Sequence, residues 1–294
     1  AAPIELGDVL RESLFTKVEA TVLTSATLAT RRGFTFLQER LGLAREDLEH
    51  LDEPLELEER IVASPFDYGA QTLLAVPTDL PAAEGGAHAF QEATARVTAE
   101  IAGLSDGGLF VLFTSHGALR RVGELLRGAG AADRWPLFVH GEDDRHRLLR
   151  DFVRAERGIL LGTASFWEGV DVPGDPLRGL ILQKLPFRVP TEPITAARME
   201  AIERRGESAF HRFMLPHAAL RLKQGFGRLI RSRTDRGAVV VLDDRLVARR
   251  YGRYLRESLP PAPFVKGPWD HVRRRLAAFY DTGERPLGAL RPGA

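Results

Sequence analysis

The sequence predicts an α/β fold in which a doubly wound, mainly parallel sheet carries helices on both faces. Short runs rich in Val, Ile, Leu and Phe recur between segments of helical period. Continuous apolar runs of this length are typical of buried parallel strands, and their alternation with helices is typical of doubly wound sheets. Helices are predicted at 117–127 and 145–155, and strands at 21–24, 61–63, 73–76, 109–113, 137–139, 159–161, 180–183 and 238–242.

The chain length permits one large domain or two small ones, and the loops favour one. The Gly- and Pro-rich stretches at 80–86 and 103–108 are too short and too varied to be interdomain linkers. We therefore predict one main domain over residues 61–294. Residues 1–60 form an N-terminal segment whose strand joins either this sheet or the sheet of a preceding domain.

Composition excludes several classes of site. The formal net charge is only +1, so contact with nucleic acid would need a local basic patch. The chain has no Cys, which excludes disulfides, thiolate nucleophiles, zinc ribbons and iron-sulfur ligands within these residues. The His spacing predicts no metal site, and no apolar run approaches the roughly 18 residues that span a bilayer. We expect a cytoplasmic protein with no membrane partner.

Residues 216–231 have a strong helical period and predict a helix with two different faces. Gln224, Arg228 and Arg231 fall at i, i+4 and i+7 opposite an apolar stripe, and Gly225 and Gly227 interrupt the same stretch. Glycine inside a helix costs about 1 kcal/mol, so it indicates a place where another backbone or a nucleotide approaches. Two arginines so spaced could bind a triphosphate or a DNA phosphate. The alternative is a solvated basic face.

A second candidate is the strand and polar loop at 158–171. Ligands of parallel sheets bind beyond the carboxyl ends of strands, which is where this loop begins. Its hydroxyls can donate to phosphate oxygens, its glycine permits close backbone approach, and its carboxylates can accept from ribose or orient an arginine. The alternative is a structural turn. The residues concerned are Thr163, Ser165, Glu168, Gly169 and Asp171.

Three further positions have both a structural and a functional interpretation. Ser115 or Thr114 follows a predicted strand and is expected to cap the next helix, where a phosphate could also bind. Phe187 lies in a Pro-flanked loop and either stacks on a base or packs in the core. Asp243 and Asp244 are interpreted as caps of a helix at 245–256 and not as a metal pair.

In combination these segments resemble the DinG/XPD group of superfamily 2 DNA helicases. Residues 24–28 (TSATL) look like helicase motif III, 113–115 (FTS) like motif IV, 162–171 like motif V and 224–231 (QGFGRLIR) like motif VI. The stretch 166–171 (FWEGVD), followed by 184–187 (KLPF) and Pro190, is similar to DinG-type members. The resemblance covers roughly residues 1–260 and implies a RecA-like domain.

The resemblance also implies roles for individual residues. Motif VI would supply an arginine finger from Arg228 or Arg231, which stays open, and a phosphate-sensing Gln224. Motif V would bind nucleotide and link it to DNA, and motifs III and IV would couple hydrolysis to strand movement, with Ser25, Thr27, Thr114 and Ser115 as the matching positions. By these matches Glu168, Gly169 and Asp171 bind nucleotide, Ser25 and Thr27 couple the two events, and Thr114, Ser115, Thr163, Ser165 and Phe187 contact DNA.

The phosphate-binding loop of such motors is missing from the sequence, which contains no Gly-Lys dipeptide and no Asp-Glu-x-His. We therefore expect the chain to be the C-terminal half of a 5′ to 3′ DNA helicase and inactive by itself. Its partners would be single-stranded DNA and an N-terminal RecA-like motor domain that holds most of the ATP and Mg²⁺. Some relatives carry an iron-sulfur cluster in that domain. The alternative is a non-hydrolysing RecA-like module that binds single strands or a partner.

Overall fold

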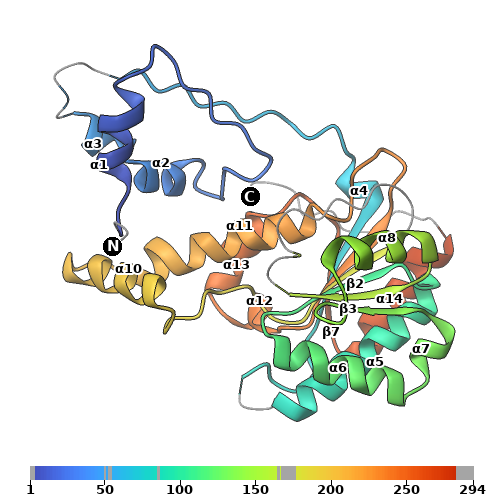
Figure 1. The fold of residues 1–294 in the computed structure, drawn as a ribbon. Helices are drawn as coiled ribbons and strands as arrows, with labels where there is room; N and C mark the ends of the chain where they lie inside the picture. Colours follow the sequence, from blue (N-terminus) through green and yellow to red (C-terminus); the bar gives the residue numbers. More distant parts are fainter. Residues whose placement is uncertain are drawn as a thin grey trace. The chain divides into compact units, whose positions relative to one another are not determined.

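The computed structural model describes residues 4–49, 51, 55–84, 87–163, 166 and 177–282. Seven strands form one sheet in the order β3-β4-β2-β5-β6-β1-β7, and every neighbouring pair is parallel (Figure 1). The strands are β1 Thr72–Pro77, β2 Leu109–Leu112, β3 Leu137–Val139, β4 Ile159–Gly162, β5 Gly179–Leu182, β6 Gly237–Val241 and β7 Phe264–Gly267.

The helices around the sheet are α4 Tyr68–Gln71, α5 Ala87–Ser105, α6 His116–Gly128, α7 Ala131–Arg134, α8 Arg145–Ala155, α12 Arg245–Ala248, α13 Tyr251–Glu257 and α14 Trp269–Thr282. The remaining ones are α1 Gly7–Leu10, α2 Thr35–Leu41, α3 Arg45–Leu48, α10 Pro193–Arg204 and α11 Leu215–Phe226, with π-helical turns at Arg11–Phe15 and Phe210–Met214. Among the described residues, we find no helix whose length and apolar character would let it cross a membrane.

The chain divides into two compact units. Unit 1 comprises Ala1–Ala63 and Phe187–Leu220, and unit 2 comprises Ser64–Pro186 and Arg221–Ala294. The sheet belongs to unit 2. The division from sequence placed 187–220 with the sheet, whereas here these residues group with the N-terminal segment.

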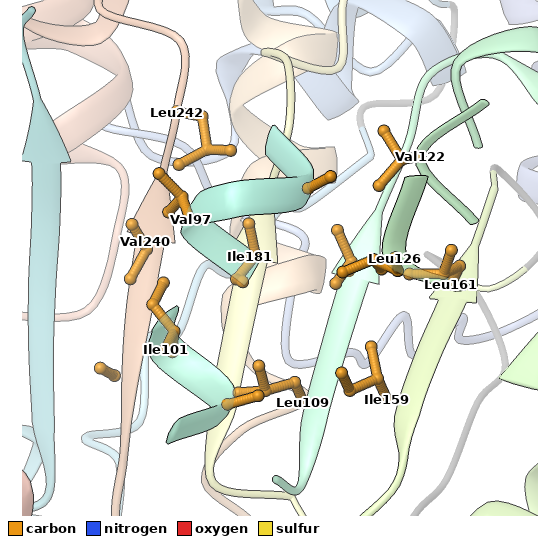
Figure 2. Close-up of a cluster of buried hydrophobic side chains, with 14 of the residues drawn as sticks. Val97, Ile101, Leu109, Val122, Leu126, Ile159, Leu161, Ile181, Val240 and Leu242 are labelled. Carbon is orange, nitrogen blue, oxygen red and sulfur yellow. The ribbon is translucent and has the colours of Figure 1, made fainter. Parts of the chain in front are cut away.

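The main core lies between one face of the sheet and helices α5, α6 and α14. Alternate residues of each strand point to this face because successive side chains of a strand alternate. Burying each such side chain stabilises the fold by about 1.5–3 kcal/mol relative to exposure. Figure 2 shows the centre of the cluster, with residues of α5 and α6 against four neighbouring strands: Val97, Ile101, Leu109, Val122, Leu126, Ile159, Leu161, Ile181, Val240 and Leu242.

The opposite face of the sheet is covered too. Phe138 points away from its neighbour Val139, which belongs to the main core. On that other side Phe152 of α8 meets Phe138 edge to face, with ring centroids 6.1 Å apart. Strands β2, β4, β5 and β6 are buried at every position, as expected when helices cover both faces. The predicted doubly wound α/β class is confirmed.

The predicted strand at 61–63 is wrong, the run at 21–24 does not join the described sheet, and one strand was missed. Residues 21–24 and 61–63 make no ladder, and Val22, Ile61 and Val62 are 86%, 70% and 78% exposed. A short apolar run does not reveal whether a pairing partner exists, and no strand of the described sheet pairs with these two. The missed strand, β7, has only two apolar residues and lies at the sheet edge beside β1.

Gly107 is required by the turn between α5 and β2, where its φ is +78°. A Cβ at this position would overlap the carbonyl oxygen of Arg157, so any side chain must displace backbone. Gly103 is four residues earlier inside α5, and a Cβ there would meet nothing within 4 Å.

We expect Gly107→Ala to lower the free energy of unfolding by roughly 2 kcal/mol or more, since left-handed backbone alone disfavours Ala by about 1–2 kcal/mol. The matched Gly103→Ala should raise it by about 0.5–1 kcal/mol, because Ala is the better helix former. Urea unfolding of both variants measures whether each free energy of unfolding falls or rises relative to the wild type. Equal effects would contradict the assigned turn.

Candidate functional site

Polar residues gather where the strands end, at what we call the carboxyl edge of the sheet. Thr114 and Ser115 follow β2 and are exposed, and Thr163 follows β4 and is buried. The Ser115 hydroxyl accepts from the backbone N–H of Ala118 at 3.3 Å, so Ser115 and not Thr114 is the N-cap of α6. The hydroxyls therefore stand at the positive end of a 13-residue helix, where anions are favoured.

Thr163 lies between two histidines that were not predicted from the sequence. Its Oγ1 is 2.8 Å from Nδ1 of His140 and 3.3 Å from Nε2 of His116. The His140 ring also meets Phe166 edge to face at 4.7 Å. Burial lowers the pKa of His140, and the neighbouring His116 and Arg145 lower it further. At neutral pH this ring is therefore uncharged.

A positional signal could have revealed both histidines. His140 follows the predicted strand 137–139, and His116 comes three residues after the strand 109–113. Parallel strands end at one edge, so residues after neighbouring strands converge there. The Thr163 hydroxyl is already engaged by two rings. Chemically the cluster therefore offers a donor and acceptor set of one hydroxyl and two imidazoles.

Several predicted residues lie elsewhere. Ser165, Glu168, Gly169 and Asp171 fall outside the described residues. Phe187 belongs to unit 1, where its ring is 5.7 Å from Phe210 beside a small core of Phe36, Phe213 and Met214, so it packs as the core interpretation expected.

The two residues assigned to coupling lie close together in unit 1. The hydroxyls of Ser25 and Thr27 are 3.4 Å apart, and the Thr27 N–H donates to Ser25 Oγ at 3.3 Å. Both are exposed or nearly so. The structure thus brings these two residues together within unit 1.

The predicted helix 216–231 is too long, because α11 ends at Phe226. Its apolar stripe is buried as predicted, including Leu222 and Phe226 at 0% exposure. After Phe226 the backbone hydrogen bonds span three residues instead of the four of an α-helix. The Arg228 N–H donates to Gly225 O at 3.1 Å, and the Leu229 N–H donates to Phe226 O at 3.2 Å. Glycine disfavours helix, so the break falls at the glycine pair. Gln224, Arg228 and Arg231 therefore do not share one helical face.

A loop built around Asp235 carries Arg231. One carboxylate oxygen of Asp235 accepts from the N–H groups of Arg231 and Ser232 at 2.6 and 2.7 Å, and the other accepts from the Ser232 hydroxyl at 2.6 Å. The amide of Gln71 donates to the carbonyls of Ser232 and Asp235 at 2.8 and 2.7 Å. Burial raises the pKa of Asp235, but these hydrogen bonds outweigh it and leave the pKa below its ordinary value.

This loop stands at the other edge of the sheet, where the strands begin. It runs directly into β6, and Gln71 directly precedes β1. Within unit 2 the motif VI-like residues are therefore at the amino edge, while Thr114, Ser115 and Thr163 are at the carboxyl edge. The described motif-like residues of unit 2 thus lie at two different edges of the sheet.

The Asp243 carboxylate is buried and organises the carboxyl edge. It accepts from the Leu185 N–H at 2.9 Å and from the Arg245 guanidinium at 2.6 and 2.8 Å, which raises the pKa of Arg245 against the effect of burial. The Arg245 N–H also donates to it at 3.2 Å, whereas Asp244, which is the N-cap residue of α12, makes no side-chain cap hydrogen bond. The helix predicted at 245–256 is two short helices, α12 and α13. Over the described ranges, no group of three His, Cys, Asp or Glu could hold a metal ion.

Asp235→Asn tests whether the ionised carboxylate holds the Arg231 loop. The substitution should lower the free energy of unfolding at pH 7 by about 1–3 kcal/mol, because backbone donors lose a charged acceptor. Since folding lowers the pKa of Asp235, its stabilisation is present above the ordinary carboxyl pKa of about 4 and is lost as the pH falls through the lowered value.

Urea unfolding of both proteins at pH 7 and near pH 3 measures this difference, which should shrink in acid. Asp281→Asn, on an exposed residue of α14, is the control and should change little at either pH. A wild-type advantage that is independent of pH would mean that the charge does not hold the loop.

Two curated proteins align with most of the chain. The ATP-dependent DNA helicase YoaA of Escherichia coli (strain K12) is 40% identical over 261 residues, which cover 89% of this chain and 38% of that protein. The 3′-5′ exonuclease DinG of Bacillus subtilis (strain 168) is 35% identical over 263 residues, covering 88% of this chain and 27% of that protein. The chain thus spans well under half the length of these relatives, and the predicted resemblance to the DinG/XPD group is confirmed.

Fold and family agree with this resemblance. A solved XPD helicase structure superposes with a TM-score of 0.59 at 16% identity, covering 90% of this chain and 45% of that one. At this identity the match supports the RecA-like fold alone. A family model described as Helicase C-terminal domain matches residues 98–262. Because that match covers more than half of the 294 residues, the chain belongs to the family of helicase C-terminal domains.

Proposed function

We propose that this chain is the C-terminal motor half of an ATP-dependent DNA helicase. The observation that carries the proposal is the Asp235 loop, which fixes the backbone of Arg231 directly after the turn that holds Arg228. An arginine finger must meet the transition state in one geometry, so its backbone must be held before the nucleotide arrives. The hydrogen bonds to Asp235 and Gln71 provide such a hold.

The nucleotide would be bound mainly by an N-terminal RecA-like motor domain. Among the described residues no group could hold a metal ion, so Mg²⁺ would accompany the ATP phosphates on that domain. Gln224 would sense the γ-phosphate, and one of Arg228 and Arg231 would stabilise the charge that develops on it. In the same model Glu168, Gly169 and Asp171 contribute to nucleotide binding.

Residues 1–60 would belong functionally to the N-terminal motor domain. Val22 is 86% exposed in the run 21–24, although its composition is that of a buried strand. A sheet in the preceding domain is the partner that would bury it. Ser25 and Thr27 directly follow this run and would then couple hydrolysis to strand movement, while residues 61–294 form the C-terminal domain.

Single-stranded DNA would bind at the carboxyl edge. Thr114 and Ser115 are exposed at the N-terminus of α6, where the helix dipole favours phosphate. Thr163 would act there together with His116 and His140, and Ser165 and Phe187 remain candidates for DNA contact. The proposed polarity is 5′ to 3′.

Replacing the finger should nearly abolish ATPase activity in the full-length protein. We expect Arg228→Ala or Arg231→Ala to reduce DNA-stimulated hydrolysis by roughly 10³- to 10⁵-fold, because an arginine finger stabilises charge that develops on the phosphoryl group in the transition state. Steady-state phosphate release measures the rate, and circular dichroism checks the fold. Arg233→Ala, an exposed arginine of the same loop, should retain activity. Near-normal rates of ATP hydrolysis in both test variants would contradict the proposal.

DNA contact by the chain can be tested without ATP. The affinity for a single-stranded oligonucleotide should fall as salt rises, since each phosphate contact releases counterions with a slope of about −0.7 in log–log form. Thr114→Val should weaken binding at every salt concentration without unfolding the chain, because Thr114 is exposed and Ser115 supplies the helix cap. Affinity indifferent to salt would contradict phosphate binding.

A further inference from the structure

Unit 1 contains a cavity of about 220 Å³ that none of the helicase motifs explains. Its wall comes from α1, α2, α10 and the π-helical turn Phe210–Met214. Residues far apart in sequence therefore surround one space. The floor is aromatic, with Phe36 and Phe213, which belong to the small core of this unit.

Two arginines in this wall stack on the aromatic floor. The Arg40 guanidinium lies 5.6 Å from the centre of the Phe213 ring and 6.0 Å from that of Phe36. The Arg198 guanidinium lies 5.9 Å from the centre of the same Phe213 ring. Both side chains are half-buried. Stacking fixes each guanidinium plane and leaves its N–H edge for hydrogen bonding.

The other arginines of the cavity are neutralised by carboxylates. Arg11 pairs with Asp8 and lies 3.7 Å from Asp47, Arg205 pairs with Glu5, and Arg212 lies 2.8 Å from Glu39 and 3.0 Å from Glu207. By contrast, no carboxylate among the described residues lies within 4 Å of Arg40 or Arg198. Glu192 acts on Arg198 only from a greater distance, and its own ion-pair partner is Arg188 at 3.4 Å. One Arg198 N–H donates to the Ile4 carbonyl at 3.2 Å.

The remaining acidic side chain of the wall does not neutralise this pair. Glu46 acts on Glu39, whose pKa is raised by burial, although Arg212 opposes the rise. Burial lowers the pKa of Arg40 to about 10, and the charges of Arg198 and Arg188 lower it further. Two stacked, like-charged groups thus face one cavity, and within the described part of the chain neither has a carboxylate in ion-pair distance. A doubly charged anion would offset both their desolvation and their mutual repulsion.

We propose that the Arg40–Arg198 cavity of unit 1 is a phosphate-binding site, formed by two guanidinium groups held on the Phe213 ring. The ligand is a phosphate group, either free or carried by a nucleic acid strand. Planar guanidinium edges suit phosphate oxygens because each can donate two parallel hydrogen bonds. The site does not include the motif VI-like arginines, so the proposed phosphate binding and the proposed helicase activity can be tested separately.

The test is a titration of the 294-residue chain with inorganic phosphate, followed through the arginine Nε–H resonances. The signals of Arg40 and Arg198 should move together and saturate. Arg40→Gln and Arg198→Gln keep most of each side chain but remove the charge, and each should weaken binding by about tenfold or more, as expected for loss of a charge-assisted contact.

Arg204→Gln is the matched control. Arg204 is on α10 like Arg198, is exposed and lies outside the cavity, so its removal changes net charge equally and should leave phosphate affinity unchanged. If circular dichroism shows that a test variant does not fold, the shifts of the wild-type Arg40 and Arg198 resonances still show whether phosphate binds there. Arg40 and Arg198 signals that stay fixed at saturating phosphate would overturn the proposal, as would unaltered affinity in folded variants.

A second arm identifies the source of the phosphate. The same proteins are titrated with oligothymidylate. Parallel weakening for phosphate and oligonucleotide would assign the cavity to the backbone of a nucleic acid strand. Weakening for phosphate alone would assign it to a free phosphate group.

Discussion

All seven strands run in the same direction, so every connection between sheet neighbours must cross a face of the sheet before the next strand begins. Helices therefore cover both faces, and the loops divide into those that follow strands and those that precede them. Chemistry can then be placed only at two edges. The hydroxyls and histidines follow strands, whereas Gln224, Arg228 and Arg231 precede β6. A single rigid layer separates the two groups, and a shift of the sheet moves both at once.

An element of the fold could be predicted from the sequence when the residues that determine it are close together in the chain. The helix predicted at 145–155 matches α8, because its period, its Asp144 cap and its ends are all encoded within a dozen residues. The buried strands were predicted equally well from their apolar runs. The sheet that the run at 21–24 joins could not be predicted, since its composition is that of a strand but does not identify the neighbouring strand. The end of α11 was misplaced because Gly225 and Gly227 were both assigned to the helix interior, whereas Gly225 is the second-last residue of α11 and Gly227 lies beyond its end.

The arrangement of the candidate site was less accessible from the sequence. The motif VI-like residues were identified, but the support of Arg231 depends on Gln71, which is separated from Ser232 by 161 positions. No local pattern encodes that contact. The pairing of His116 and His140 around Thr163 likewise arises from strand order, since β4 lies between β3 and β2 in the sheet although it follows both in sequence. Residue types were predictable from motifs, and their partners were not.

The Thr163 cluster has a consequence for where protons sit. A hydroxyl owns one hydrogen, so Thr163 can donate to only one of its two ring neighbours and must accept from the other. If His140 Nδ1 receives the hydrogen, His116 Nε2 must donate to Thr163. If the direction reverses, His140 Nδ1 donates and His116 Nε2 accepts. The hydrogen-bond roles of His116, which begins α6, and of His140, which follows β3, are thus coupled through one hydroxyl, so a ligand that changes the role of one ring changes the role of the other.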